Sequence, residues 1–317
     1  GRFSASALPS SGTASAATAS TGAPITSAAQ VPRLYARPAM THLAAWIQAA
    51  RPLAQLNIAL PLLLGQALAF AALGRFSLGW MYLTGFDAAV AEQKAVATYK
   101  GKLAPATLRS AALVALAALM AMSGGLAFAG RPWAPVLALA AALLVWAYNH
   151  PPLRLAYRGH GELVQGLGTG VVLPIVGYYF QAGTFAGLQW SALVPMLLLG
   201  YVGNILTALP DVPSDRASGK LSYPVRRGQW LARRHALELL AMAAAMSGLV
   251  LPGLPTGVVV LLAVPVLAVA ALAVPLLGSA DAENGRECER FVLLTAGAAQ
   301  LLVLLWALAL VLRGLLG

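Results

Sequence analysis

Two aspartates and two basic residues stand close together in residues 209–220, a polar stretch of an otherwise apolar chain. Asp211 and Asp215 are four residues apart, which is close to one helical turn, so both carboxylates can project from one face and hold a hard divalent cation. Arg216 and Lys220 repeat the spacing with positive charge. An acid pair that binds a metal, beside a basic pair, suits a diphosphate that is held and then expelled. The alternative is that both acids are solvated loop charges.

The composition indicates that these residues belong to a membrane protein. Hydrophobic residues make up 59% of the chain and charged residues 10%, against about 25% charged residues in a soluble domain. The mean hydropathy is +0.75. Apolar runs of about 20 residues between short polar loops predict an all-α bundle of membrane-spanning helices and do not fit a β-barrel. The single cysteine, Cys288, excludes a disulfide framework.

Nine segments are expected to cross the membrane. They are residues 53–73, 76–91, 110–129, 133–148, 162–181, 190–209, 235–251, 256–277 and 291–312. The second segment is short for a crossing, which takes about 20 residues, and it is interrupted by Gly85 and Asp87. Asn57 in the first segment should face protein, where its amide either bonds a neighbouring helix or contacts a substrate.

The positive charge fits nine crossings with the N-terminus on the cytoplasmic side, or its organellar equivalent. All but three of the 21 Lys and Arg residues then lie on that side, and the exceptions are Arg75, Arg131 and Arg313. The net charge of +11 is therefore interpreted as membrane topology and attraction to the anionic lipid of the bilayer. Nucleic-acid binding is not expected, because no folded basic domain carries the charge.

A second polar cluster, residues 148–162, falls on the same side as the aspartates. Arg158 can bind phosphate oxygens through its planar guanidinium, and the ring faces of Tyr148 and Tyr157 can line the path of a carbocation. The alternative, which we favour for Arg154, is that the arginines only follow the charge bias of membrane loops.

Residues 1–39 are rich in Ser, Ala, Thr and Pro and contain no acid. They are predicted to be a disordered leader or a transit-like segment, and residues 40–317 a membrane-embedded domain. The alternative is that Met40 is the natural start. The host membrane is then either a bacterial inner membrane or an organelle membrane.

These motifs together resemble the UbiA superfamily of intramembrane prenyltransferases, and among them the branch that makes menaquinone and related quinones. The resemblance covers about residues 43–312 and rests on the first span, the 148–162 loop and the pattern from Asp211 to Lys220. It implies a nine-helix bundle that binds Mg²⁺ and a polyprenyl diphosphate between two Asp-rich motifs. The polyprenyl chain would pass to an aromatic acceptor of the hydroxynaphthoate or hydroxybenzoate type. The diphosphate-binding basic residues of the family correspond to Arg158 and Lys220.

The first Asp-rich motif of that family is degenerate in this sequence. Asp87 alone is in register, with Glu92 one residue past the last acid of the pattern. The resemblance therefore implies Asp87, Asp211 and Asp215 as catalytic residues, and these three with Glu92 as Mg²⁺ ligands. Thr207 replaces the Asn that the second motif should carry, and Asn204, about one turn earlier, is the candidate substitute.

Three hypotheses follow from the sequence. The first is an active, Mg²⁺-dependent aromatic prenyltransferase. The second is a non-catalytic isoprenoid-binding homologue, or a defective gene model, that has lost the first motif. The third is an unrelated transporter, which would predict charges inside the spans and an internal repeat.

Overall fold

The computed structural model describes residues 56–74, 105–279 and 285–316, and every regular element in these ranges is helical. The all-α prediction is therefore confirmed for the described residues. The 1–39 leader, the 76–91 segment, Asp87 and Glu92 lie outside them, so what the sequence predicts for these parts stays a prediction.

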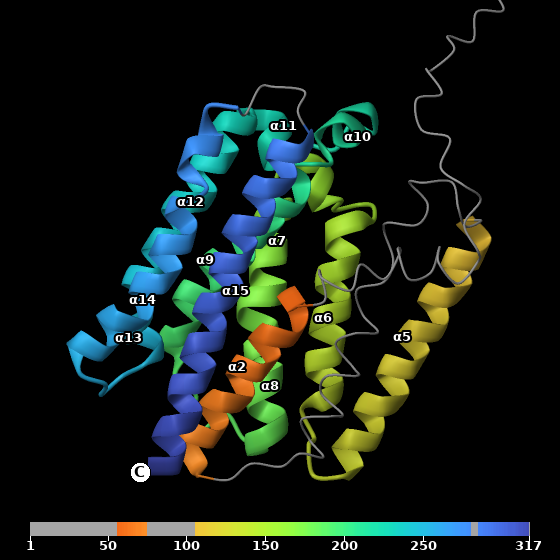
Figure 1. Cartoon of the computed structure of the whole chain (residues 1–317). Coiled ribbons are helices and arrows are strands. Elements are labelled where there is room, and N and C mark those ends of the chain that lie inside the picture. Colours follow the sequence, from red (N-terminus) through yellow and green to blue (C-terminus); the bar gives the residue numbers. More distant parts are fainter. Residues whose placement is uncertain (1–55, 75–104, 280–284, 317) are drawn as a thin grey trace, which may run out of the picture. The chain divides into compact units, whose positions relative to one another are not determined.

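The longer helices follow the expected apolar segments closely (Figure 1). They are α2 (Leu56–Leu73), α5 (Pro105–Phe128), α6 (Ala134–Asn149), α7 (Gly161–Leu167), the π-helix η2 (Gly168–Val172), α8 (Leu173–Ala182), α9 (Leu193–Ala208), α12 (Gln229–Ala245), α13 (Ser247–Val250), α14 (Thr256–Ala271) and α15 (Gly285–Leu316). Short helices fill the connections: η1 (Leu155–Arg158), η3 (Trp190–Ala192), α10 (Val212–Ala217), α11 (Tyr223–Arg227) and η4 (Val274–Leu277).

Three helical stretches are long and apolar enough to cross a membrane: Gly161–Ala182, Trp190–Ala208 and Gly285–Leu316. Four shorter helices are also apolar, namely Ile58–Leu73, Leu113–Phe128, Ala134–Asn149 and Thr256–Ala271. The structure thus gives membrane-type helices where the sequence predicts them, while the number of crossings remains a prediction.

Several helix boundaries differ from the expected ones: the helix expected at 291–312 runs from Gly285 to Leu316, and the one expected at 110–129 begins at Pro105. The segment predicted at 235–251 is helical from Gln229, and it stops at Ala245 before a short α13. The part of this helix before residue 235 includes Arg233, which is fully buried although its charge suggested a loop. Its Nη1 donates to the carbonyl of Leu276 at 2.7 Å, and its guanidinium lies 5.4 Å from the ring centre of Phe291. Tertiary contacts therefore pair part of a guanidinium that the sequence alone places in water, while its buried Nε has no hydrogen-bond partner.

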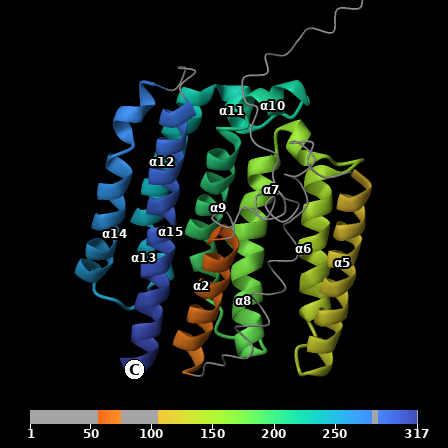
Figure 2. The same cartoon turned by 45° about the vertical axis from the view of Figure 1, so that its right-hand side comes forward.

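Helix α2 packs against α8 and α15, and α9 packs against α7 and α12 (Figures 1 and 2). Glycines allow the closest approaches. A Cβ at Gly65 would lie 2.0 Å from the carbonyl oxygen of Pro174, and one at Gly170 would lie 2.2 Å from that of Met196. Small residues at such crossings let helix backbones touch, which is how helices associate where water does not drive packing.

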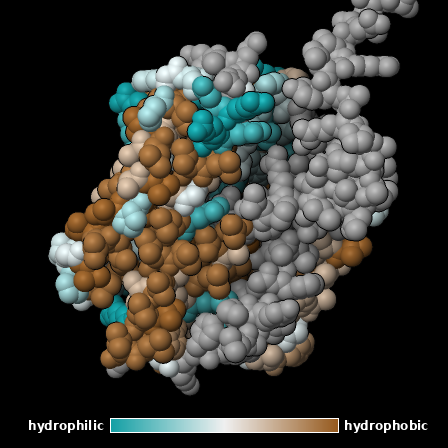
Figure 3. Space-filling view, in the orientation of Figure 1, coloured by the Kyte–Doolittle hydropathy of each residue, from teal (hydrophilic) through white to brown (hydrophobic). Residues whose placement is uncertain are grey.

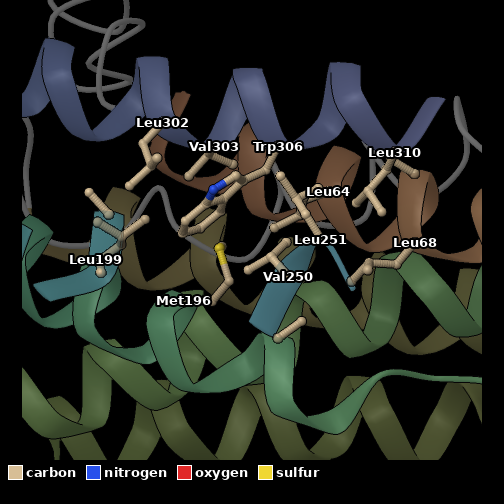
Figure 4. Close-up of a cluster of buried hydrophobic side chains, with 14 of the residues drawn as sticks. Leu64, Leu68, Met196, Leu199, Val250, Leu251, Leu302, Val303, Trp306 and Leu310 are labelled. Carbon is tan, nitrogen blue, oxygen red and sulfur yellow. The ribbon is translucent and has the colours of Figure 1, made fainter. Parts of the chain in front are cut away.

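The largest buried cluster gathers around Trp306 of α15 (Figure 4). Side chains from α2, α9 and α13 surround the indole, among them Leu64, Met196 and Val250. The indole Nε1 donates to Ser247 Oγ at 2.9 Å, and that hydroxyl donates to the carbonyl of Ala244 at 2.6 Å. The one polar atom of the indole is thus paired where α12 ends.

The surface separates by polarity. In Figure 3 hydrophobic residues cover the visible face along α14 and α15, and hydrophilic residues gather at the end where α10 and α11 lie. Large apolar side chains such as Leu261, Leu293 and Leu304 are more than half exposed. An apolar belt with a polar end is expected of a helical bundle that has lipid around it.

Candidate functional site

The two aspartates of the 209–220 stretch lie at the start and in the middle of the short helix α10. Asp211 occupies the N-cap position, and the amide of Asp215 donates to its carbonyl at 2.8 Å. Asp215 is 6% exposed, and its Oδ2 is buried without a hydrogen-bond partner. A buried carboxylate oxygen in this state is costly unless a cation pairs with it.

The end of α10 brings Lys220 back to Asp215. The Lys220 amide donates to the carbonyl of Asp215 at 2.9 Å, and the Gly219 amide to that of Arg216 at 3.2 Å. This pair of bonds is the Schellman motif, and Gly219 supplies the left-handed residue that it needs, with φ of +70°. The side chains meet as a result, since Lys220 Nζ lies 3.5 Å from Asp215 Oδ1.

Lys220 keeps its charge in this place. Burial lowers the pKa of a lysine, but Tyr148, Asp215 and Asp211 act in the other direction, and the pKa of Lys220 is raised above its ordinary value. Its Nζ lies 5.8 Å from the centre of the Tyr148 ring. At neutral pH the site therefore contains a cation held between a carboxylate and an aromatic face.

Behind Lys220, a polar chain runs into the bundle. The amide nitrogen of Asn204 in α9 donates to the Tyr148 hydroxyl at 3.3 Å and also to Gln165 Oε1 of α7. Asn204 is buried at 4% exposure. The structure therefore brings together Tyr148, Asn204, Asp215 and Lys220, four residues that the sequence proposed from separate stretches.

The 148–162 loop also lies next to this group, but two of its residues have partners within the loop. Arg158 is exposed, and its Nη2 donates to the carbonyl of Pro152 at 2.8 Å. The Arg154 guanidinium lies 4.0 Å from the centre of the Tyr157 ring. Arg216 is exposed on α10. Asn57 lies in α2, and its side chain is outside what the structure describes.

Two polar residues of α7, the buried Glu162 and the half-buried Gln165, had no role predicted from the sequence. Glu162 accepts a hydrogen bond from the amide of Tyr223, and it forms an ion pair with Arg226 in which Oε2 lies 3.3 Å from Nη2. The signal was present in the sequence, because an acid and an amide three residues apart open a membrane-type segment. The π-helix that follows α7 is a feature often found at functional sites.

A divalent metal ion fits the donors that are present. The Asp215 Oδ2 atom is buried without a partner, and Asp211 is one helical turn away, so two hard oxygen ligands come from one short helix. Among the described residues no group of three His, Cys, Asp or Glu side chains converges on one point. Mg²⁺ needs only one or two protein carboxylates when phosphate oxygens and water complete its shell.

The architecture is thus that of a helical, membrane-type bundle with a cluster of acidic and basic side chains at its polar end. Comparison with protein families gives the particular family. Residues 40–297 match the model of the UbiA prenyltransferase family, and the chain belongs to that family. The resemblance drawn from the motifs is confirmed, and the hypothesis of an unrelated transporter loses its support.

Two characterised relatives are similar to parts of the chain. The 1,4-dihydroxy-2-naphthoate octaprenyltransferase of Mycobacterium tuberculosis is 29% identical over 163 residues, 50% of this chain and 53% of that protein. The 2-carboxy-1,4-naphthoquinone phytyltransferase of Synechocystis sp. is 30% identical over 120 residues, 37% of each chain. The chain therefore spans about half the length of the first relative and just over a third of the second.

Solved structures share the fold. A UbiA homologue from Archaeoglobus fulgidus superimposes with a TM-score of 0.57 and 16% identity, over 84% of this chain and 99% of that one. Its complex with GPP and Mg²⁺ gives 0.56 and 15%, with the same coverage. The apo structure of a homologue from Aeropyrum pernix K1 gives 0.56 and 17%, over 81% and 97%. At these identities the likeness establishes the UbiA-type helical bundle.

Proposed function

We propose that this chain transfers a polyprenyl group from a prenyl diphosphate to an aromatic acceptor of the hydroxynaphthoate or hydroxybenzoate type, in Mg²⁺-dependent quinone biosynthesis. The observation that carries the proposal is the buried, unpartnered Oδ2 of Asp215 beside the charged Lys220. This pair suits a metal-bound diphosphate, since one group attracts the cation and the other the anion. Family membership and two relatives named for naphthoate or naphthoquinone substrates support the donor and acceptor classes.

In this proposal the basic residues take the charge of the leaving group. The bond between the prenyl carbon and the diphosphate oxygen breaks, and its electron pair leaves with the diphosphate. A carbon–carbon bond to the electron-rich ring forms, and the attacked ring carbon then releases its proton to water or diphosphate, or its carboxylate as CO₂, which restores aromaticity. Lys220, with Arg216 and Arg158, shares the charge that develops on the diphosphate. The Tyr148 and Tyr157 rings present π faces to an allylic cation. Asn57 and Asn204 contribute amide contacts to the substrates.

Asp211 and Asp215 would hold Mg²⁺, with Asp87 and Glu92 as proposed further ligands. A bound Mg²⁺ ion supplies Lewis-acid neutralisation of the diphosphate. The protein adds a fixed position for the acids, because Asp215 is held through its backbone by Asp211 and by Lys220. The apolar belt admits the prenyl chain from lipid, where it is far more soluble than in water.

A transfer assay tests the proposal. The protein in lipid nanodiscs is given geranyl diphosphate with 1,4-dihydroxy-2-naphthoate or 4-hydroxybenzoate, with Mg²⁺ or with a chelator. We expect a prenylated product only with Mg²⁺, and a loss of about 10²–10³-fold in rate for Asp215→Asn, as for other groups that stabilise transition-state charge. Asp211→Ala should lose Mg²⁺-dependent binding while the protein stays folded. The exposed acid Glu289 provides the control, Glu289→Gln. Turnover that is indifferent to Asp215→Asn would refute the assignment.

Because the first motif is degenerate, the alternative function is that of a non-catalytic isoprenoid-binding homologue. That protein would bind geranyl diphosphate with Mg²⁺ by calorimetry and give no product with either acceptor. The variant Asp87→Asn further separates an active prenyltransferase from a non-catalytic homologue. Turnover lost in this variant supports Asp87 as the surviving part of the first motif, whereas unchanged turnover shows that this acid is not a ligand.

A further inference from the structure

Glu162 is a buried acid whose two carboxylate oxygens both point to one segment of the chain. The residue is 1% exposed at the start of α7. Its Oε1 accepts from the Tyr223 amide, and its Oε2 pairs with Arg226 Nη2 at 3.3 Å. A buried carboxylate costs several kcal/mol unless it is paired and hydrogen-bonded. Both carboxylate oxygens of Glu162 therefore bind the segment that follows the aspartates, at Tyr223 and Arg226.

Arg226 also contacts the 148–162 loop, through Gly159. Its Nε donates to the carbonyl of Leu221 at 3.1 Å. The same guanidinium lies against Gly159, where a Cβ would come within 2.8 Å of Nε. Gly159 also has a φ of +80°, a conformation that suits glycine. The 148–162 loop, the start of α7 and residues 221–226 are thus joined through one ion pair.

The segment that Glu162 holds begins directly after Lys220. Lys220 is tied to Asp215 through the backbone bond of 2.9 Å and the side-chain contact of 3.5 Å. On the other side, Gln165 lies three residues after Glu162 on α7 and contacts Asn204. Residues three apart share a helix face. One face of α7 therefore sets the position of the Lys220–Tyr223 segment and of the polar chain behind it.

We propose that Glu162 is a positioning residue, which holds the Lys220–Tyr223 segment so that the Lys220 ammonium stays between Asp215 and the Tyr148 ring. Glu162 itself does not touch the substrate. Its role in ligand affinity rests on the proposed function, whereas its hold on the segment stands on the geometry alone.

Two substitutions of Glu162 separate charge from packing. Glu162→Gln keeps the shape and one acceptor oxygen for the Tyr223 amide but loses the ion pair with Arg226. Glu162→Ala loses both contacts. The matched control is Glu289→Gln, since Glu289 is an exposed acid on α15, away from the Lys220–Tyr223 segment in the sequence. Glu162→Gln is the decisive variant if Glu162→Ala fails to fold, because it leaves no cavity.

Hydrogen exchange of the ligand-free protein in nanodiscs is the first measurement. We expect the amides of Lys220 and Tyr223 to exchange at least about tenfold faster in Glu162→Ala, and faster by a smaller factor in Glu162→Gln, with α9 and α15 unchanged, because a local opening raises exchange only where contacts are lost. Exchange unchanged at Lys220 and Tyr223 in Glu162→Gln and Glu162→Ala would overturn the proposal. So would an equal rise throughout α9 and α15, since Glu162 would then serve general stability only.

Calorimetry with geranyl diphosphate and Mg²⁺ is the second measurement. For Glu162→Gln we expect affinity about tenfold weaker than wild type with an unchanged melting temperature, and for Glu289→Gln the wild-type affinity. The double variant Glu162→Gln with Arg226→Gln should be less than additive, because both changes break one ion pair. If the wild type binds no diphosphate, the proposed function fails, and the exchange experiment still decides the role of Glu162.

Discussion

At the scale of single residues, the site depends on how Lys220 keeps its charge while its side chain is largely covered. Burial opposes the ammonium, and Tyr148 together with the Asp215 and Asp211 carboxylates outweighs that cost, so the pKa of Lys220 is raised. Asp215 gains as well, since one of its oxygens has a cation at 3.5 Å while the other stays available. The pair is thus arranged to receive a metal and an anion together.

Substitution of Lys220 tests this arrangement. Lys220→Met keeps the length of the side chain and removes the charge, so the affinity for geranyl diphosphate should fall by about tenfold or more, as when a charged partner is lost. Lys220→Arg should retain more of the affinity. Calorimetry in nanodiscs measures both variants, and equal affinities for wild type and Lys220→Met would contradict the role.

The stability that Lys220 contributes should depend on pH, because its pKa is raised on folding. A group whose pKa is raised on folding gives its full stabilisation below its unfolded pKa and loses it as pH rises through the folded pKa. The ordinary value for lysine is 10.5. The difference in the free energy of unfolding between wild type and Lys220→Met, measured by denaturation at each pH, should therefore be constant from pH 6 to 9 and shrink only above pH 10.5.

At the scale of elements, the Schellman turn after α10 connects sequence to site. Asp215, Arg216 and Gly219 supply the two carbonyls and the left-handed residue that the turn requires. Without this turn Lys220 would continue away from Asp215, because an α-helix advances 1.5 Å per residue. A local motif thus creates the ion pair.

Gly219→Ala tests the turn without changing any contact. No atom lies within 4 Å of the added Cβ, so the whole effect comes from the positive φ, which costs about 1–2 kcal/mol for an L-residue. We expect several-fold weaker binding of geranyl diphosphate with Mg²⁺. Gly203→Ala is the matched control, since its Cβ also meets no atom and its φ is not positive. Similar affinities for the two variants would show that the turn does not determine the site.

At the scale of the whole molecule, the structure separates a polar end from an apolar belt. The α10 and α11 helices lie at one end, and α8 finishes at the other (Figure 1). Three basic residues lie at the end of the bundle where α10 and α11 are: Lys220, Arg226 and Arg227. This agrees with the positive-inside bias that the sequence predicts for the cytoplasmic or equivalent side.

Labelling from each side tests the orientation. In a Cys288→Ser background, Ala217→Cys and Ala186→Cys each add one exposed thiol, in α10 and in the connection after α8. A membrane-impermeant maleimide should label Ala217→Cys from the cytoplasmic side only and Ala186→Cys from the opposite side only. Labelling of both from the same side would refute the topology.

Several features were determined by the sequence itself. The apolar runs predicted helices at the right places, since a long apolar segment in lipid must satisfy its backbone within a helix. The acids of α10 and Lys220 were recognised because they are neighbours along the chain, and their geometry depends on one turn. The family was recognised from the order of the same local motifs.

Only the tertiary structure decided the partners of Glu162, Gln165, Asn204 and Arg233. Asn204 meets Gln165 because glycines let the segment of α7 and η2 approach α9 closely, and Glu162 meets Tyr223 across 61 positions. Arg233 is buried because the Leu276 carbonyl reaches it from η4. Such pairs are set by how helices cross, and the free energy of a buried charge depends on all its neighbours at once, which no local pattern along a sequence contains.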